Sequence, residues 1–162
     1  MKSLLILRHA DAEVASANGL DITRALSNLG KQHACALGRR MADDNIRPDA
    51  IACSEALRAR ETAELVAEHG GWTAPITVLE QFYNASVTDL SVYIKEQARD
   101  VDQLCIVAHA PGVADLASWL TTPADDLALI YAAGTLAAVD LDINNWAELG
   151  SGCGALRFLL AP

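Results

Sequence analysis

Basic residues are outnumbered in this sequence, and long apolar runs are missing from it. There are 12 Lys and Arg against 21 Asp and Glu, so the formal net charge is −9. Nucleic acid is therefore not expected as a partner, and neither is an anionic membrane surface, because both are bound through an excess of cations. The apolar run that follows Met1 ends at Arg8, too early for a signal peptide or a membrane span. These absences predict a cytoplasmic protein.

Cysteine and aromatic residues are also scarce. The four cysteines lie at positions 35, 53, 105 and 153, and none of them forms a CxxC pair. This spacing indicates neither a zinc site nor a dithiol redox motif. Cys53 and Cys105 lie in apolar runs and are expected to be small core residues. Aromatic residues are 5% of the chain, so the core must consist mostly of Leu, Ala, Val and Ile.

The composition is that of a globular protein, and strand-like apolar runs alternate along the chain with helix-like periodic segments. Apolar residues make up 52% and charged residues 20% of the 162 positions, which predicts a single domain spanning residues 1–162. Strands are predicted at 3–7, 49–53, 75–79, 103–107, 135–141 and 156–160. Helices are predicted at about 27–41, 54–69, 89–98 and 111–120. This order predicts a three-layer α/β/α sandwich with a mostly parallel central sheet, whose last two strands can pair antiparallel.

Several residues are expected to mark the ends of these helices. Ser27 and Ser54 are expected to cap the first and second helices, because their hydroxyl oxygens can accept from free backbone N–H groups. The pair Gly70-Gly71 is expected to stop the second helix. Pro111 suits a first helical position, where no N–H donor is required.

The polar residues that can carry chemistry follow three of the predicted strands. Arg8 and His9 follow the first strand, Ser54 and Arg58 the second, and His109 the strand at 103–107. The carboxyl ends of parallel strands lie on one edge of a sheet, where ligands bind. Two arginines and two histidines gathered there would attract an anion, and the planar guanidinium group suits phosphoryl oxygens.

Each of these residues also has an ordinary structural interpretation. An Arg-His dipeptide is common, Arg58 alone could be an exposed helical arginine, and His109 alone could be bonded within a loop. The catalytic interpretation is favoured because all of them fall at strand ends. His33 lies in the middle of a predicted helix, and His69 lies at a helix end where a cation is mildly favourable. Both are expected to be structural.

Three segments resemble the motifs of the histidine phosphatase superfamily, which includes phosphoglycerate mutases and acid phosphatases. They are LRHA (7–10), SEALRARETA (54–63) and VAHAPG (107–112). The segment DITRALS (21–27), followed by Gly30, is similar to the family's lead into the first helix. FYNAS (82–86) and WAEL (146–149) look most like the short SixA-type phosphohistidine phosphatases. The third motif commonly has Asn before Pro-Gly, and Ala110 occupies that position here.

The resemblance implies a mechanism and its residues. Neutral His9 would attack phosphorus to give a phosphohistidine intermediate, which water then hydrolyses. Arg8, Arg58 and His109 would hold the phosphoryl oxygens, and a protonated His109 would add positive charge. No metal and no cofactor are expected. Glu80 is the best positional match for the glutamate that serves as general acid in mutase-like members, or else a plain surface residue.

The resemblance also suggests the substrate. The chain has no long insertion that could form a lid, and an open site suits phosphohistidine on a protein. One alternative is a phosphatase of small phosphate esters or a mutase-like enzyme. Another is a non-catalytic module that binds phosphoproteins, although the presence of Arg8, His9 and His109 argues against it. The expected partner is thus a phosphorylated protein or a small phosphorylated substrate.

Overall fold

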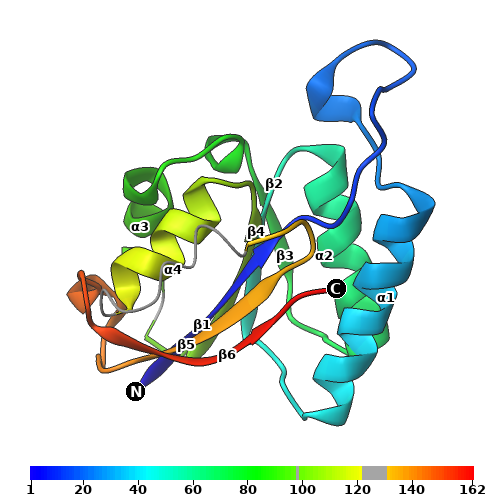
Figure 1. The fold of residues 1–162 in the computed structure, drawn as a ribbon. Coiled ribbons are helices and arrows are strands. Elements are labelled where there is room, and N and C mark those ends of the chain that lie inside the picture. Colours follow the sequence, from blue (N-terminus) through cyan, green and yellow to red (C-terminus); the bar gives the residue numbers. More distant parts are fainter. Residues whose placement is uncertain (98, 122–130) are drawn as a thin grey trace.

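A computed structural model describes residues 1–97, 99–121 and 131–162 (Figure 1). Its centre is a six-stranded sheet in the order β3-β2-β4-β1-β5-β6. The strands are β1 (Lys2–Arg8), β2 (Ala50–Ser54), β3 (Ile76–Leu79), β4 (Gln103–Ala108), β5 (Leu136–Leu141) and β6 (Gly154–Leu160). The α-helices are α1 (Asn28–Asp43), α2 (Leu57–Gly70), α3 (Val87–Lys95) and α4 (Gly112–Leu120). Short 3₁₀ turns are η1 (Asp21–Thr23), η2 (Glu80–Phe82) and η4 (Trp146–Glu148).

The sheet is mostly parallel, as the sequence predicts. Strands β3, β2, β4 and β1 run parallel to one another, whereas β5 pairs antiparallel with β1 and β6 pairs antiparallel with β5. The antiparallel pair lies at the end of the chain, where two predicted strands have no helix between them. Because β1, β2 and β4 are neighbours and share a direction, their carboxyl ends meet at one edge.

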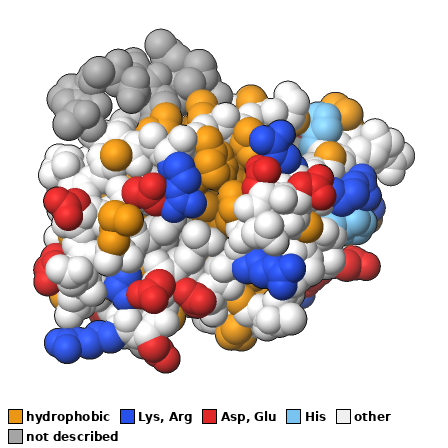
Figure 2. Space-filling view, turned by 90° about the horizontal axis from the view of Figure 1, so that it is seen from below, with side chains coloured by type: hydrophobic (Ala, Val, Ile, Leu, Met, Phe, Trp, Pro, Cys, Tyr) orange, Lys and Arg blue, Asp and Glu red, His pale blue; other side chains and the backbone are white. Residues whose placement is uncertain are grey.

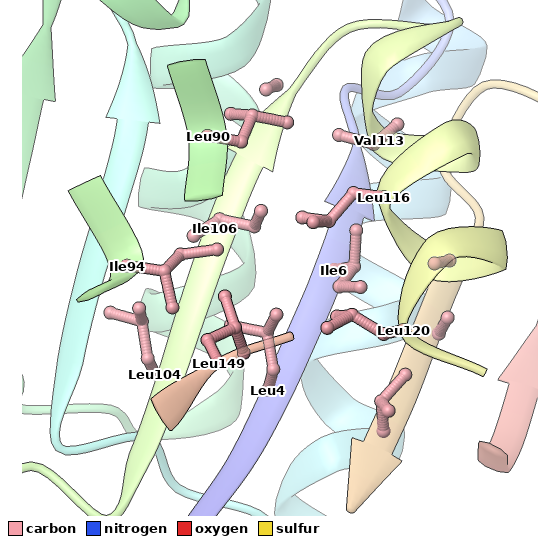
Figure 3. Close-up of a cluster of buried hydrophobic side chains, with 14 of the residues drawn as sticks. Leu4, Ile6, Leu90, Ile94, Leu104, Ile106, Val113, Leu116, Leu120 and Leu149 are labelled. Atoms are coloured by element: carbon pink, nitrogen blue, oxygen red, sulfur yellow. The ribbon is translucent and has the colours of Figure 1, made fainter. Parts of the chain in front are cut away.

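Helices cover both faces of the sheet, so the predicted α/β/α sandwich is confirmed. In Figure 1, α1 and α2 lie on one side of the sheet and α3 and α4 on the other. Side chains alternate along β1: Leu4 and Ile6 face α3 and α4, and Leu5 and Leu7 face α1 and α2. Figure 3 shows the first of these layers, whose members include Leu90, Ile94, Leu104, Ile106, Val113, Leu116 and Leu120. Cys53 and Cys105 are buried in the second layer, as expected for core residues.

The helix ends confirm some of the expected caps and correct others. The Ser27 side chain accepts from the Gly30 N–H and caps α1 as predicted. The N-cap of α2 is Ala56, so the prediction that Ser54 caps this helix is wrong. Ser54 is the last residue of β2, and its hydroxyl lies 2.8 Å from His109 Nε2 and also accepts from the Ala56 N–H at 3.3 Å. Gly71, at φ 63°, ends α2, as the Gly70-Gly71 pair predicts.

The remaining helices differ from prediction by a turn or less. Helix α3 begins at Val87, because Ser86 forms a capping box with Asp89. It ends at Lys95, and its predicted end at Ala98 lies outside the described residues. Pro111 is the N-cap of α4 and not its first helical residue.

The molecular surface carries charges of both signs. Figure 2 views the molecule from below the orientation of Figure 1, where β1 begins, and acidic and basic side chains lie intermixed on that face. Within the described residues, none of the helices combines the length and the hydropathy required to cross a bilayer. The cationic side chains that concern function gather at the opposite end of the parallel strands.

Candidate active site

A cavity of about 320 Å³ opens at the carboxyl ends of β1, β2 and β4. It contains the four residues that the sequence predicts to meet there, Arg8, His9, Arg58 and His109. The other residues that line it are Asp11, Ala12, Arg24, Asn84, Ala110 and Ala133. The polar residues of three distant segments are thus brought into one pocket, because parallel strands share a carboxyl edge.

His9 follows β1 directly and has a fixed tautomer. Its backbone N–H donates to the Ala108 carbonyl of β4, and its side chain is 9% exposed. Nδ1 lies 2.8 Å from the carbonyl oxygen of Ala10. A carbonyl oxygen only accepts, so Nδ1 carries the hydrogen and Nε2 of the neutral ring keeps its lone pair. Arg58 Nε donates to this Nε2 at 3.3 Å, in agreement with that assignment.

The environment of His9 keeps the ring neutral near pH 7. Burial lowers the pKa of His9 to about 4. The hydrogen bond to the Ala10 carbonyl opposes this shift of the pKa, whereas the positive charges of Arg58, Arg8 and Arg24 add to it. A neutral imidazole with an unprotonated Nε2 is the form of histidine that can act as a nucleophile.

Arg58 lies in the first turn of α2 and connects the two histidines. Its side chain is 4% exposed. Nη2 lies 3.4 Å from His109 Nδ1 and 3.1 Å from Asp21 Oδ2, and Nη1 donates to the Asp21 carbonyl at 2.9 Å. The guanidinium group is therefore held in one orientation between two histidines and one aspartate.

His109 follows β4 and is as deeply buried as Arg58, at 4% exposed. Its ring centroid lies 5.1 Å from that of His9, and the edge of Tyr83 packs against it at 5.5 Å. Nε2 lies 2.8 Å from Ser54 Oγ. Burial, followed by the neighbouring His9 and Arg58, lowers the pKa of His109 to about 3. His109 is therefore neutral near pH 7 without a bound anion, and its protonation in a phosphoryl complex stays a prediction.

Arg8 is the last residue of β1 and is half-buried. Its Nη1 donates to the Tyr131 carbonyl oxygen at 2.8 Å, which directs the guanidinium group along the wall of the pocket. Its Nε is buried, and within residues 1–97, 99–121 and 131–162 it has no hydrogen-bond partner. An anion in the pocket would supply an acceptor for this group.

Two residues of the loop between β1 and α1 belong to this site, although the sequence assigns them no role. Arg24 lines the pocket, and its Nε donates to Asp21 Oδ1 at 2.9 Å. Asp21 Oδ2 accepts from the Tyr83 hydroxyl at 2.6 Å and from Arg58. These donors, Tyr83 first, hold the pKa of the Asp21 carboxyl well below its usual range. The motif at 21–27 was the available signal, but an irregular loop has no periodicity from which its position could be predicted.

Glu80 does not join the other predicted residues. It is exposed at the start of η2 and is not one of the residues that line the pocket. The carboxylate that lines the pocket is Asp11, whose Oδ2 accepts from the Ser27 hydroxyl at 2.5 Å. The geometry therefore brings a different acidic residue to the site from the one that the sequence suggests.

The two other histidines lie outside the pocket. His69 Nδ1 lies 3.0 Å from the Leu65 carbonyl oxygen near the end of α2, which is the structural position expected for it. His33 is half-buried in α1 and is not among the pocket residues either.

Comparison with known sequences gives the family. The model of the histidine phosphatase superfamily (branch 1) matches residues 4–106, which include Arg8, His9 and Arg58. The uncharacterized protein Rv1276c of Mycobacterium tuberculosis (strain ATCC 25618 / H37Rv) is 30% identical to this chain. The match covers 93% of this chain and 96% of the relative.

Solved structures share the fold over nearly the whole chain. A candidate phosphohistidine phosphatase SixA from Nakamurella multipartitia is similar with a TM-score of 0.88 and 24% identity, covering 99% of this chain and 96% of that one. Another from Agrobacterium tumefaciens has a TM-score of 0.83 and 25% identity, covering 99% and 98%. The protein histidine phosphatase SixA complexed with tungstate has a TM-score of 0.79 and 22% identity, covering 98% and 96%.

The family match and the pocket agree residue by residue. The matched range carries the strand end with Arg8 and His9 and the helix start with Arg58, and His109 follows it by three residues in the same pocket. The chain belongs to the histidine phosphatase superfamily.

Proposed function

We propose that this chain, as a single domain of residues 1–162, is a phosphatase that removes phosphate from phosphohistidine on a protein, with His9 as nucleophile. One observation carries the proposal. The Nδ1–H of His9 is bound to the Ala10 carbonyl, which leaves the Nε2 lone pair in a pocket lined by Arg8, Arg24, Arg58 and His109. An unprotonated nitrogen beside cationic donors is the arrangement that nucleophilic phosphoryl transfer requires, once Arg58 Nε gives up its 3.3 Å bond to Nε2 for a phosphoryl oxygen.

The chemistry takes place in two displacements at phosphorus. In the first, His9 Nε2 forms a bond to phosphorus, and the bond to the leaving nitrogen breaks with its electron pair going to the leaving imidazole. In the second, water attacks phosphorus, the bond from phosphorus to Nε2 breaks with its electron pair returning to His9, and the proton lost by the water leaves with inorganic phosphate. Arg8, Arg58 and His109 donate to the non-bridging oxygens and stabilise their charge in both steps.

The leaving group favours phosphohistidine over a phosphate ester. An alkoxide leaves poorly without a proton from an acid, whereas imidazole, with an ordinary pKa near 6.5, departs readily once protonated. Glu80, the acid expected from the sequence, lies outside the pocket lining, and the carboxylate that does line it, Asp11, would be needed as an acid for an ester but not for phosphohistidine. The overall similarity to SixA proteins from two organisms supports the same substrate class.

A rapid-quench experiment with ³²P-phosphohistidine protein tests the proposal. We expect an acid-labile, base-stable phosphoenzyme in the wild type and none in His9→Ala. His33→Ala is the matched control, because it removes a histidine of α1 outside the pocket, and it should form the intermediate normally. Binding without phosphate release would identify a phosphoprotein-binding module instead, and normal turnover by His9→Ala would refute the mechanism.

A substrate panel measures the substrate class. We expect kcat/KM for phosphohistidine protein to exceed that for phosphotyrosine peptide and for alkyl phosphates, with activity retained in EDTA. A preference for alkyl phosphates would assign the enzyme to small esters, as the alternative holds.

A further inference from the structure

The hydrogen-bond partners of the two pocket histidines differ in kind. His9 is paired at Nδ1 with a carbonyl oxygen, which can only accept. His109 is paired at Nε2 with the Ser54 hydroxyl, at 2.8 Å, and a hydroxyl can both accept and donate. Ser54 is fully buried, so no bulk water competes for this bond. One histidine is thus held in a single tautomer, whereas the other has a partner that allows two.

In neither tautomer of His109 do the described residues supply a matching partner for every donor and acceptor around the ring. Arg58 Nη2 has only hydrogens to offer, and it lies 3.4 Å from Nδ1. Nδ1 therefore accepts, and Nε2–H donates to Ser54 Oγ, which also accepts from the Ala56 N–H at 3.3 Å. In this arrangement the buried Ser54 hydroxyl hydrogen has no acceptor within the described part of the chain.

The other tautomer of His109, with its proton on Nδ1, satisfies Ser54 but leaves Nδ1–H without an acceptor. If the Ser54 hydroxyl donates to Nε2, the proton of His109 is on Nδ1 and faces Arg58 Nη2, so that two donors oppose each other. A phosphoryl oxygen between these two groups would remove the conflict, because Nδ1–H and Nη2–H could both donate to it. Every donor of the cluster would then have an acceptor, and a buried unmatched donor is costly.

We propose that Ser54 is a positioning residue that changes from acceptor to donor when a phosphoryl group binds, and thereby moves the proton of His109 from Nε2 to Nδ1. This inference rests on the proposed function, since it assigns His109 Nδ1–H to a phosphoryl oxygen. The ring gains a proton at Nδ1 and releases one from Nε2, so it stays neutral, and Ser54 keeps its own hydrogen. Because Nε2 contacts only the buried Ser54 hydroxyl, the exchange takes place while the ring is turned away from Ser54 as the phosphoryl group enters: water takes the proton from Nε2 and returns one to Nδ1.

The alternative to a tautomer change is a doubly protonated ring, and burial opposes it. The low pKa of His109 makes the imidazolium form unfavourable beside Arg58 and Arg8. A neutral ring that can reverse its donor needs no such charge. The structural consequence is that Ser54, at the end of β2, contacts both His109 and the N–H of Ala56, and that its closer partner is His109.

Nitrogen NMR of ¹⁵N-histidine-labelled protein tests the inference with tungstate as the probe. In the free wild type we expect His109 with its proton on Nε2, and in the tungstate complex on Nδ1, whereas His9 keeps its proton on Nδ1 in both. In Ser54→Ala, where Nε2 of His109 loses its hydrogen-bond partner in either tautomer, we expect tungstate to bind about 10-fold more weakly. An unchanged tautomer, or a doubly protonated His109, in the wild-type complex would overturn the inference.

Kinetics provide the second measurement. Ser54→Ala should lower kcat/KM for phosphohistidine protein about 10-fold, and Ser54→Thr, which keeps the hydroxyl, should recover most of this loss. Equal losses in both variants would show that Ser54 matters only for packing. The NMR result does not need turnover, so a tautomer change in a protein that releases no phosphate would contradict the proposed function alone. A His9 phosphoenzyme with an unchanged His109 tautomer would contradict this inference alone.

Discussion

The two histidines of the pocket, His9 and His109, differ in the hydrogen-bond partners that set their tautomers. The Ala10 carbonyl fixes the tautomer of His9, and the Ser54 hydroxyl leaves that of His109 open to change. Both rings are neutral near pH 7, because burial and neighbouring cations lower the pKa of each. The roles of these side chains thus follow from hydrogen-bond partners more than from residue type.

The lowered pKa of His9 predicts an unusual titration. Protonation occupies the Nε2 lone pair, so the reactive form is lost only as the pH falls through about 4. We expect the His9 ring signal in an NMR titration to have its midpoint near 4 and to be constant from pH 8 to 6. Arg58→Gln should raise this midpoint, because it removes a positive charge next to the ring. A midpoint near 6.5 in the wild type would contradict the account.

The positions of Asp11 and Glu80 predict that Asp11→Asn and Glu80→Gln affect activity differently. Asp11 lines the cavity and Glu80 does not. We expect Asp11→Asn to lower kcat/KM for alkyl phosphates by up to about 10²-fold, because a poor leaving group needs a proton. The loss for phosphohistidine protein should be much smaller. Glu80→Gln is the matched control and should leave both substrates within about twofold; a selective loss in Glu80→Gln would restore Glu80 as the acid.

The sequence predicts the residues of the pocket that lie next to regular structure. Arg8, His9, Arg58 and His109 follow strands, and strand ends can be located from apolar runs. Arg24 and Asp21 could not be placed in this way, since the loop that carries them has no periodic pattern. Glu80 was matched by its position in the chain alone, and the short turn η2 leaves it exposed outside the pocket lining.

At the scale of elements, helix α1 packs closely against its neighbours through two glycines. A Cβ on Gly30 would lie 1.9 Å from the Asp11 carbonyl oxygen, and one on Gly38 would lie 2.7 Å from the Val66 carbonyl oxygen. Both contacts are with backbone atoms, which cannot turn aside as a side chain can. The first contact connects α1 to the loop that carries the active site, and the second connects it to α2.

These contacts predict different effects for two similar substitutions. Gly30→Ala and Gly38→Ala should each lower the free energy of unfolding by about 1–3 kcal/mol, because the crowded backbones must move apart. Only Gly30→Ala should also lower kcat/KM, since it displaces Asp11. Urea unfolding and steady-state kinetics, measured at a temperature where both variants are folded, compare them. Equal losses of kcat/KM in the two variants would show that the loop does not depend on this contact.

The order of the elements was predictable, but some of their ends were not. Apolar periodicity located the sheet and its helices, because burial of one face dictates the pattern. The start of α2 was misassigned, since Ser54 has a capping side chain but a buried histidine as its competing partner. A sequence does not show which of two possible hydrogen bonds a hydroxyl will make.

At the scale of the whole molecule, the two buried histidines couple folding to pH. In the unfolded chain each ring has a pKa near 6.5, whereas in the folded protein the pKa values are about 4 and about 3. Between pH 6.5 and 4 the unfolded state therefore binds more protons, so stability falls as the pH falls. Each histidine contributes at most about 1.4 kcal/mol per pH unit in this window.

Urea unfolding at pH 7 and pH 5 measures this coupling. We expect a lower free energy of unfolding at pH 5 in the wild type and a smaller difference in the variant with both His9→Gln and His109→Gln. The ionised Asp21 does not interfere, because its lowered pKa affects stability only in more acidic solution. An equally large difference in the double variant would assign the pH dependence to other groups.

The central position of β1 also has a consequence for how the protein is made. Ser3 pairs with Gln103 of β4, and Leu7 pairs with Leu136 of β5. As the chain leaves the ribosome, β1, which directly precedes His9, is synthesised about 100 residues before its first neighbour in the sheet. During that interval β1 has no neighbouring strand with which to pair. The pocket of Arg8, His9, Arg58 and His109 therefore cannot form before β4 and His109 have been synthesised.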